Sequence, residues 1–225
     1  MSYRYHLTPI FRVIKRAIYL LSPVHKANTI YLPMIDFSIL NTELDLSQCD
    51  TLMFTSKQAV KSADVLNSEW KEYPSLAIGT ATARQIENLG GKVEYCSTSF
   101  YGASLSQEII NRFKNRNILY LRPKEISFDS KRYLAQKGII LQEKVIYQTH
   151  CVTYPKEAKP QYNAIIIFTS PSTIHCFLKN FSWDMSYIAI VIGESTKAHL
   201  PKNIQYEVAD EPTIDACIKK AYQTL

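Results

Sequence analysis

The sequence predicts an α/β protein with two open parallel sheets. Short apolar runs alternate with amphipathic helical patterns along most of the chain, which is typical of parallel sheets covered by helices. Two segments recur at a constant offset, and an N-terminal apolar run resembles one near the middle. Together these observations indicate two similar domains rather than one large one.

Two short segments recur with the same spacing. The pairs are LMFTSKQAV (52–60) with IIFTSPSTI (166–174), and AIGTATA (77–83) with VIGESTKA (191–198). Both pairs are 114 positions apart. Two landmarks that keep one offset indicate a duplicated structural unit.

A third similarity decides which parts of the chain belong together. IYLLSP (18–23) resembles ILYLRP (118–123), so the N-terminal strand is expected to join the C-terminal copy. The middle of the chain is then an insertion. The predicted parts are a discontinuous first domain at 18–35 plus 152–225, an inserted second domain at 38–147, and a basic N-terminal extension at 1–17.

The expected elements follow one plan in each copy. In the inserted domain the predicted strands are 51–56, 75–79, 92–96 and 117–122, with helical patterns after each. In the second copy the predicted strands are 164–170, 187–193 and 203–209, with helices at 172–181 and 213–223. The segments 32–39 and 143–154 connect the copies, run in opposite directions and are expected to pair as an antiparallel hinge. The predicted fold is therefore a pair of flavodoxin-like domains with a ligand cleft between them.

Composition narrows the functional class. The 225 residues are 46% hydrophobic and 20% charged, without an apolar run of 18 residues, so we expect a soluble protein with no membrane span. The net charge of +6 suits nucleic acid, an anionic surface or a small anion. Because no cluster of Lys and Arg is present, a small polyanion is favoured over nucleic acid. For the basic N-terminus, an organelle presequence and a peripheral membrane segment remain alternatives.

The five cysteines form an odd, scattered set without CxxC spacing. This pattern predicts reduced core thiols in the cytoplasm. His150 precedes Cys151 and His175 precedes Cys176, but sequence neighbours point to different faces of a strand or helix. No metal site is expected from them.

The repeated turns place hydroxyl side chains just before helices. The residues are Thr55, Ser56, Thr80, Thr82, Thr169, Ser170, Ser172, Ser195 and Thr196. Helix N-termini attract anions, so several such turns suit a ligand with many carboxylates. Simple helix capping is the alternative explanation for each residue. The chain has no GxGxxG, GxxxxGK[ST] or GxSxG motif, which disfavours dinucleotide, P-loop and serine-hydrolase sites.

The repeated segments, in their order, match a known family. FTSKQAV, AIGTATA, YGASL, ILYLR, VIYQT, IIFTSPSTI, VIGESTKA and EPTIDACI together resemble the uroporphyrinogen-III synthases over residues 18–225. The resemblance implies a two-domain hydro-lyase of haem biosynthesis without metal or organic cofactor. Its substrate, linear hydroxymethylbilane, carries eight carboxylates and is cyclised with loss of water and inversion of ring D.

The resemblance also implies roles for individual residues. Thr82, Thr196, Ser56 and Ser170 match hydroxyl residues that contact the substrate, and Tyr147 matches a tyrosine that helps the hydroxyl to leave. A phenol with a pKa near 10 stays protonated at neutral pH and can donate a hydrogen bond. Packing within the hinge is the alternative for Tyr147. Arg122 is expected to bind a carboxylate or, alternatively, to be an exposed structural residue.

The chain departs from the family at 22–30, which is too short for the helix expected after the first strand. A non-catalytic, hinged binder of small polyanions is the alternative function, and it would not need Tyr147. The expected partners are hydroxymethylbilane and, transiently, hydroxymethylbilane synthase. No nucleic acid or membrane partner is expected, and the protein is predicted to be a monomer.

Overall fold

The computed structural model describes residues 16–97, 99 and 102–224. Most of the predicted basic extension (1–17) lies outside these residues. Of the described residues, the contacts place 16–36 and 151–224 in one compact unit and those within Phe37–His150 in the other. Both units contain mostly parallel sheets accompanied by helices, so the predicted α/β class is confirmed. Within the described part of the chain, no helix has the length and apolarity needed to cross a membrane.

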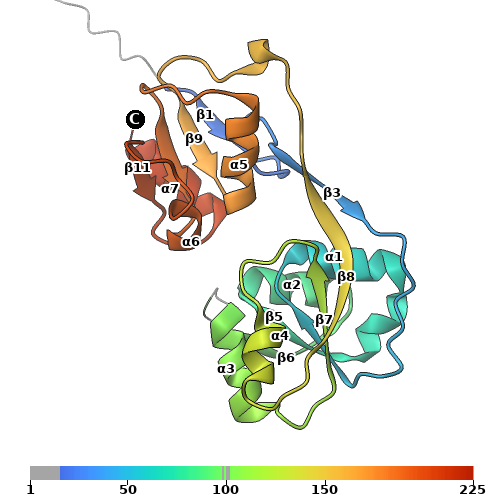
Figure 1. Ribbon diagram of the computed structural model, residues 1–225. Helices are drawn as coiled ribbons and strands as arrows, with labels where there is room; N and C mark the ends of the chain where they lie inside the picture. Colours follow the sequence, from blue (N-terminus) through green and yellow to red (C-terminus); the bar gives the residue numbers. More distant parts are fainter. Residues whose placement is uncertain (1–15, 98, 100–101, 225) are drawn as a thin grey trace, which may run out of the picture. The chain divides into compact units, whose positions relative to one another are not determined.

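The unit formed by residues 37–150 contains a six-stranded sheet with the order β3-β8-β7-β4-β5-β6. The strands are β3 (Ile35–Ile39), β4 (Thr51–Phe54), β5 (Pro74–Ile78), β6 (Lys92–Ser97), β7 (Ile118–Pro123) and β8 (Gln142–Cys151). From β8 to β6, all neighbouring strands pair in parallel. Each of β4, β5, β6 and β7 is followed by a helix before the next strand (Figure 1).

Helices cover both faces of this sheet. They are α1 (Lys57–Leu66), α2 (Thr80–Asn88), α3 (Gly102–Arg112) and α4 (Ser130–Ala135), with a 3-10 turn at Ser68–Glu72. Because side chains alternate along β4, Leu52 and Phe54 pack with α1 and α2 on one face. Met53 packs with α3 and α4 on the other face. Trp70 is fully buried and packs edge-on against Phe54.

The other unit contains a five-stranded sheet with the order β11-β10-β9-β1-β2, in which every neighbouring pair is parallel. Its strands are β1 (Ile18–Leu20), β2 (Ile30–Tyr31), β9 (Ile165–Phe168), β10 (Ile188–Val191) and β11 (Tyr206–Val208). Its helices are α5 (Pro171–Asn180), α6 (Glu194–Lys197) and α7 (Ile214–Gln223), with a 3-10 turn at Lys156–Ala158. No helix lies between β1 and β2, as the short segment 22–30 predicted.

The two sheets repeat one topology. In each, the first strand of the repeat lies at the centre, β4 in one unit and β9 in the other. The N-terminal strand β1 pairs with β9 as β7 pairs with β4, so β1 lies in the same sheet as the strands of the C-terminal copy. If β3 is left out and the strands β4 to β8 are numbered 1 to 5 along the chain, their order in the sheet is 3-2-1-4-5. Flavodoxin-like sheets have the order 2-1-3-4-5. The flavodoxin-like assignment is therefore wrong, because hydrophobic patterning identifies strands but not their neighbours.

The segments where the chain passes between the units are paired within each unit. The Leu40 amide donates to the Ile146 carbonyl at 2.9 Å, and the Val152 amide donates to the Met34 carbonyl at 3.0 Å. From Met34 to Leu40 the residue numbers rise, whereas those of their partners fall from Val152 to Ile146. The pairing of these segments is therefore antiparallel.

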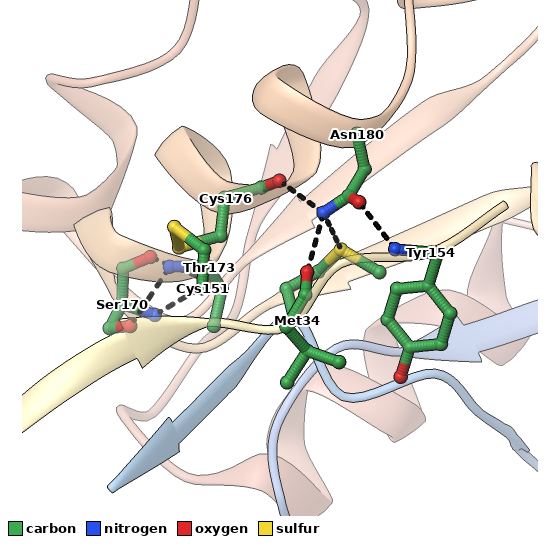
Figure 2. The surroundings of a disulfide bond; sticks show 8 residues. Met34, Cys151, Tyr154, Ser170, Thr173, Cys176 and Asn180 are labelled. Atoms are coloured by element: carbon green, nitrogen blue, oxygen red, sulfur yellow. Dashed lines mark hydrogen bonds between the residues drawn. A yellow bond between two sulfur atoms is a disulfide. The ribbon is translucent and has the colours of Figure 1, made fainter. Parts of the chain in front are cut away.

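A disulfide joins Cys151 to Cys176, so the prediction that all five cysteines are reduced thiols is wrong (Figure 2). The two residues are 25 positions apart, without the spacing of a redox or metal motif. Only the packing of the end of β8 against α5 brings their Cα atoms to 5.1 Å. The remaining thiols are Cys49, Cys96 and Cys217, of which the last is buried.

Asn180 reinforces this attachment of the connecting segment to α5. Its amide nitrogen donates to the carbonyls of Val152 at 2.8 Å and Cys176 at 2.9 Å. Its side-chain oxygen accepts from the Tyr154 amide at 2.8 Å (Figure 2). One side chain thus satisfies polar backbone groups that would otherwise lack partners where the chain re-enters the unit.

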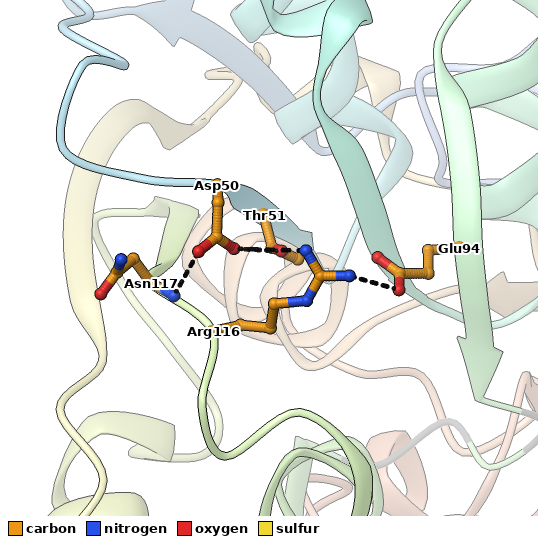
Figure 3. A network of polar contacts seen from close by, with 5 residues as sticks. All are labelled: Asp50, Thr51, Glu94, Arg116 and Asn117. Atoms are coloured by element: carbon orange, nitrogen blue, oxygen red, sulfur yellow. Dashed lines mark hydrogen bonds and ion pairs between the residues drawn. The ribbon is translucent and has the colours of Figure 1, made fainter.

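A polar network joins the starts of β4 and β7 to β6 in the six-stranded sheet (Figure 3). The Asp50 carboxylate accepts hydrogen bonds from the Asn117 amide at 3.0 Å and the Thr51 hydroxyl at 2.7 Å. The Arg116 guanidinium lies 3.8 Å from Asp50 and 3.0 Å from Glu94. Asp50 therefore ties the start of β4 to the start of β7.

We predict that Asp50→Ala lowers the free energy of unfolding by about 1–2 kcal/mol, because charge-assisted hydrogen bonds to an amide and a hydroxyl are lost. Urea denaturation of the variant and the wild type measures the difference. Glu125→Ala, which removes an exposed carboxylate elsewhere in the same unit, is the control and should change stability by less than about 0.5 kcal/mol. Equal stability of Asp50→Ala and the control would contradict the role assigned to Asp50.

Candidate functional site

The turn after β4 carries the first pair of predicted site residues, Thr55 and Ser56. β4 lies between β5 and β7 in the sheet. After β4 the chain first forms β5 on one side of β4 and later forms β7 on the other side. This is the point where the strand order reverses, and open α/β sheets bind ligands at the carboxyl edge there. Ser56 is the N-cap of α1 and accepts a hydrogen bond from the Ala59 amide at 3.1 Å.

Tyr147 reaches this turn from β8. Its hydroxyl lies 2.9 Å from the Ser56 hydroxyl, and its ring packs edge-on against Phe37 at 5.8 Å between ring centres. The side chain is part of the core on the α1 face and is 4% exposed. Burial raises the pKa of the Tyr147 phenol, although the hydrogen bond with Ser56 opposes this effect. The phenol is therefore protonated at neutral pH.

Thr55 has a tyrosine partner of its own, which the sequence analysis did not identify. The Thr55 hydroxyl lies 2.8 Å from the hydroxyl of Tyr120 on β7. Tyr120 is 3% exposed, and burial raises the pKa of its phenol to about 12. The only sequence signal for it was a tyrosine with aliphatic residues on both sides in the predicted strand.

The equivalent turn in the other unit is held differently. Ser170 is the N-cap of α5 and accepts from the Thr173 amide at 3.3 Å, while the Thr173 hydroxyl accepts from the Ser170 amide at 3.3 Å. This capping box makes the turn self-contained. Ser172, half-buried in the first turn of α5, follows Pro171, which has no amide hydrogen to offer an anion.

The second pair of repeated turns is built on glycines. Gly79 and Gly193 are the N-caps of α2 and α6, without a side-chain cap. Thr80 and Ser195 are exposed, whereas Thr82 and Thr196 are 5% and 1% exposed. α6 has only four residues, so its dipole gives an anion less stabilisation than a longer helix would.

Arg122 lies at the end of β7 with its guanidinium engaged inside the unit. Nη1 donates to the carbonyls of Pro123 at 2.9 Å and Lys124 at 3.1 Å, and Nε lies 3.3 Å from the Glu143 carboxylate. An open depression of about 390 Å³ beside it is lined by Arg122, Ile126, Asp129, Lys131, Arg132, Ala135 and Glu143. Arg122 is thus neither fully exposed nor free of acidic partners.

The structure therefore brings Thr55, Ser56 and Tyr147 together at one edge of one sheet, with Tyr120 beside them. Ser170 and Ser172 share the first turn of α5. Across residues 16–97, 99 and 102–224, no three His, Cys, Asp or Glu side chains form a group that could hold a metal ion. His150 instead contacts the Ser38 hydroxyl, and His175 lies 3.1 Å from His199.

Comparisons with known proteins agree on one family. The family model described as uroporphyrinogen-III synthase HemD matches residues 24–219. A crystal structure of uroporphyrinogen-III synthetase from Helicobacter pylori 26695 is 27% identical, with a TM-score of 0.80, covering 94% of this chain and 100% of that one. A mutant uroporphyrinogen III synthase from the extremely thermophilic bacterium Thermus thermophilus is 12% identical, with a TM-score of 0.59 and coverages of 94% and 100%, and supports the fold alone. No curated protein sequence matches the chain.

We predict that Tyr120 makes the protein lose stability in alkali. Its phenol keeps its proton up to about pH 12 in the folded chain but only to about pH 10 when unfolded. The unfolded chain then binds fewer protons between these values, so the free energy of unfolding falls as the pH rises from about 10 to about 12. Urea denaturation from about pH 8 to about pH 11.5 should show a shallower fall for Tyr120→Phe, by about 2 kcal/mol at the upper end. Parallel curves for the two proteins would contradict the raised pKa.

Proposed function

The chain belongs to the uroporphyrinogen-III synthase family, and from this premise we propose that it cyclises hydroxymethylbilane to uroporphyrinogen III, as a lyase of tetrapyrrole biosynthesis that needs no metal or organic cofactor. The family match over residues 24–219 carries the proposal. The hydroxyl groups gathered at the reversal point of the sheet support it, because they supply hydrogen-bond donors without requiring a bound cofactor.

The proposed substrate is a flexible polyanion, and the repeated turns suit its carboxylates. Ser56 and Ser170 each begin a ten-residue helix whose N-terminus carries partial positive charge. Each such contact contributes about 0.3–1 kcal/mol, so several are needed to bind one molecule well. We therefore assign the turns of both units to binding, together with the hydroxyls of Thr80, Thr82, Ser172, Ser195 and Thr196 and the guanidinium of Arg122.

Tyr147 is the proposed proton donor for loss of the substrate hydroxyl. The Ser56 oxygen already accepts from the Ala59 amide. Ser56 and Tyr147 hold two hydroxyl protons, of which their shared hydrogen bond uses one. With Ser56 as the donor in this bond, the proton of Tyr147 remains to be donated to a ligand. Since burial raises the pKa of Tyr147, this donor stays protonated through the neutral range.

Control of geometry is the main catalytic task in this proposal. Unaided ring closure of hydroxymethylbilane gives the uninverted product, so the protein must hold the chain in the conformation that leads to inversion of ring D. Holding reacting atoms in a near-attack geometry accelerates a reaction by removing the entropy cost of alignment. Contacts between the fixed turns and both ends of the substrate supply that restraint.

We predict that the purified protein converts hydroxymethylbilane mainly to the type III isomer. The substrate is generated in place, the products are oxidised and the isomers are separated by chromatography, with a reaction lacking the protein as the reference. Type III product at a rate proportional to protein concentration supports the proposal and excludes a non-catalytic polyanion binder. Type I product alone, at the rate of the reference, would reject it.

We predict that Tyr147→Phe lowers kcat by about 100-fold, since a positioned proton donor contributes about 10²–10⁴-fold. KM should change little, because the aromatic ring that packs against Phe37 is retained. Tyr133→Phe, which removes a hydroxyl bonded to Gln107 elsewhere in the same unit, is the matched control and should retain wild-type kinetics. A full rate for Tyr147→Phe would remove the acid role but not the binding role of the turns.

A further inference from the structure

Tyr120 is a polar residue buried where the fold does not require one. It lies in the middle of β7, with aliphatic neighbours in the chain on both sides. Its side chain belongs to the core with Met53, Leu76 and Leu134. Burying a hydroxyl in such surroundings costs free energy unless the group is hydrogen-bonded. The hydroxyl therefore needs an explanation beyond packing.

The duplication shows what packing alone requires at this position. Tyr120 pairs with Met53 in one sheet, and Leu20 pairs with Ile167 in the other. Met53 and Ile167 are separated by the 114 positions of the repeat, so Leu20 occupies the register of Tyr120. Leu20 is completely buried. The same site in the same topology thus accepts an aliphatic residue.

The hydroxyl of Tyr120 is directed at a residue of the proposed binding turn. Its hydrogen-bond partner is the hydroxyl of Thr55, at 2.8 Å. A buried phenol hydrogen is costly to leave unpaired. If Tyr120 donates to Thr55, the hydrogen of Thr55 remains available for another acceptor. Thr55 is half-buried, so its hydroxyl has access to solvent or to a ligand.

Thr55 and Ser56 are held from the two faces of the sheet. Tyr120 belongs to the core on the α3 and α4 face, whereas Tyr147 belongs to the core on the α1 and α2 face. Neighbouring residues at a strand end point to opposite faces. Each hydroxyl of the turn is therefore hydrogen-bonded to its own buried phenol, Thr55 to Tyr120 and Ser56 to Tyr147.

We infer that Tyr120 is a positioning residue, whose hydroxyl orients that of Thr55 so that Thr55 donates a hydrogen bond to a carboxylate of the substrate. The inference rests on the proposed function, since it names the substrate of that site. It differs from the role of Tyr147, because Tyr120 acts through Thr55 and does not touch the reacting atoms. Loss of its hydroxyl should therefore weaken binding more than turnover.

Steady-state kinetics of Tyr120→Phe, Thr55→Val and the double variant test the inference. We expect Tyr120→Phe to raise KM for hydroxymethylbilane about 3- to 10-fold, as for the loss of one hydrogen bond, with kcat nearly unchanged. In the Thr55→Val background the same change should have no further effect, because the two residues act as one unit. Tyr120→Leu, the residue found at the equivalent position, should fold and show the same rise in KM.

Each outcome decides between specific explanations. Additive effects of the two single changes, or an unchanged KM in Tyr120→Phe, would overturn the inference while leaving the function intact. A lower kcat at unchanged KM would also overturn it, since that result indicates direct participation in catalysis. A wild-type protein that forms no type III isomer would instead reject the proposed function. Tyr133→Phe again controls for the loss of a phenol hydroxyl in the same unit.

Discussion

Parallel pairing at the centre of each sheet is the constraint on which the candidate site depends. β4 pairs in parallel with β7, and β9 pairs in parallel with β1. Parallel strands end at the same edge, so the turn after β4 lies beside the end of β7. The helices that follow β4 and β7 pack on opposite faces of the sheet. Side chains at the edge between them therefore remain accessible to a ligand.

The hydroxyl groups at this edge are hydrogen-bonded to buried tyrosines of the core rather than to surface residues. Tyr120 and Tyr147 are almost completely buried, and each directs its hydroxyl at one residue of the turn. Because burial raises both pKa values, the phenols remain hydrogen-bond donors or acceptors rather than anions throughout the physiological range. The proposed anionic substrate would therefore meet neutral hydroxyls and helix N-termini at this edge, with no phenolate to repel it.

Sequence patterns predicted the repeated plan and the hydroxyl turns because both are local. FTS follows a buried strand twice in this chain, and its serine, a preferred N-cap residue, caps a helix in both places, as Ser56 and Ser170. The strand order, the bond between Cys151 and Cys176, and the contact of Tyr120 with Thr55 each join residues that are distant in sequence. The hydrophobic periodicity of the sequence does not indicate which distant residues are in contact. The length of α6 was also not predictable, since the segment after Gly193 resembles its longer counterpart.

The two copies of the first turn have nearly the same backbone but different partners. Ser56 and Ser170 adopt similar extended angles before helices of equal length. At the third helical position one copy has Thr173, which closes a capping box, and the other has Ala59, which cannot. Ser170 is therefore satisfied locally, whereas Ser56 is coupled to Tyr147 on a distant strand. A turn satisfied by its own helix is suited to binding alone, whereas a turn coupled to a buried phenol can also supply a proton. This asymmetry favours the unit of residues 37–150 as the part of the protein that carries the proposed chemistry.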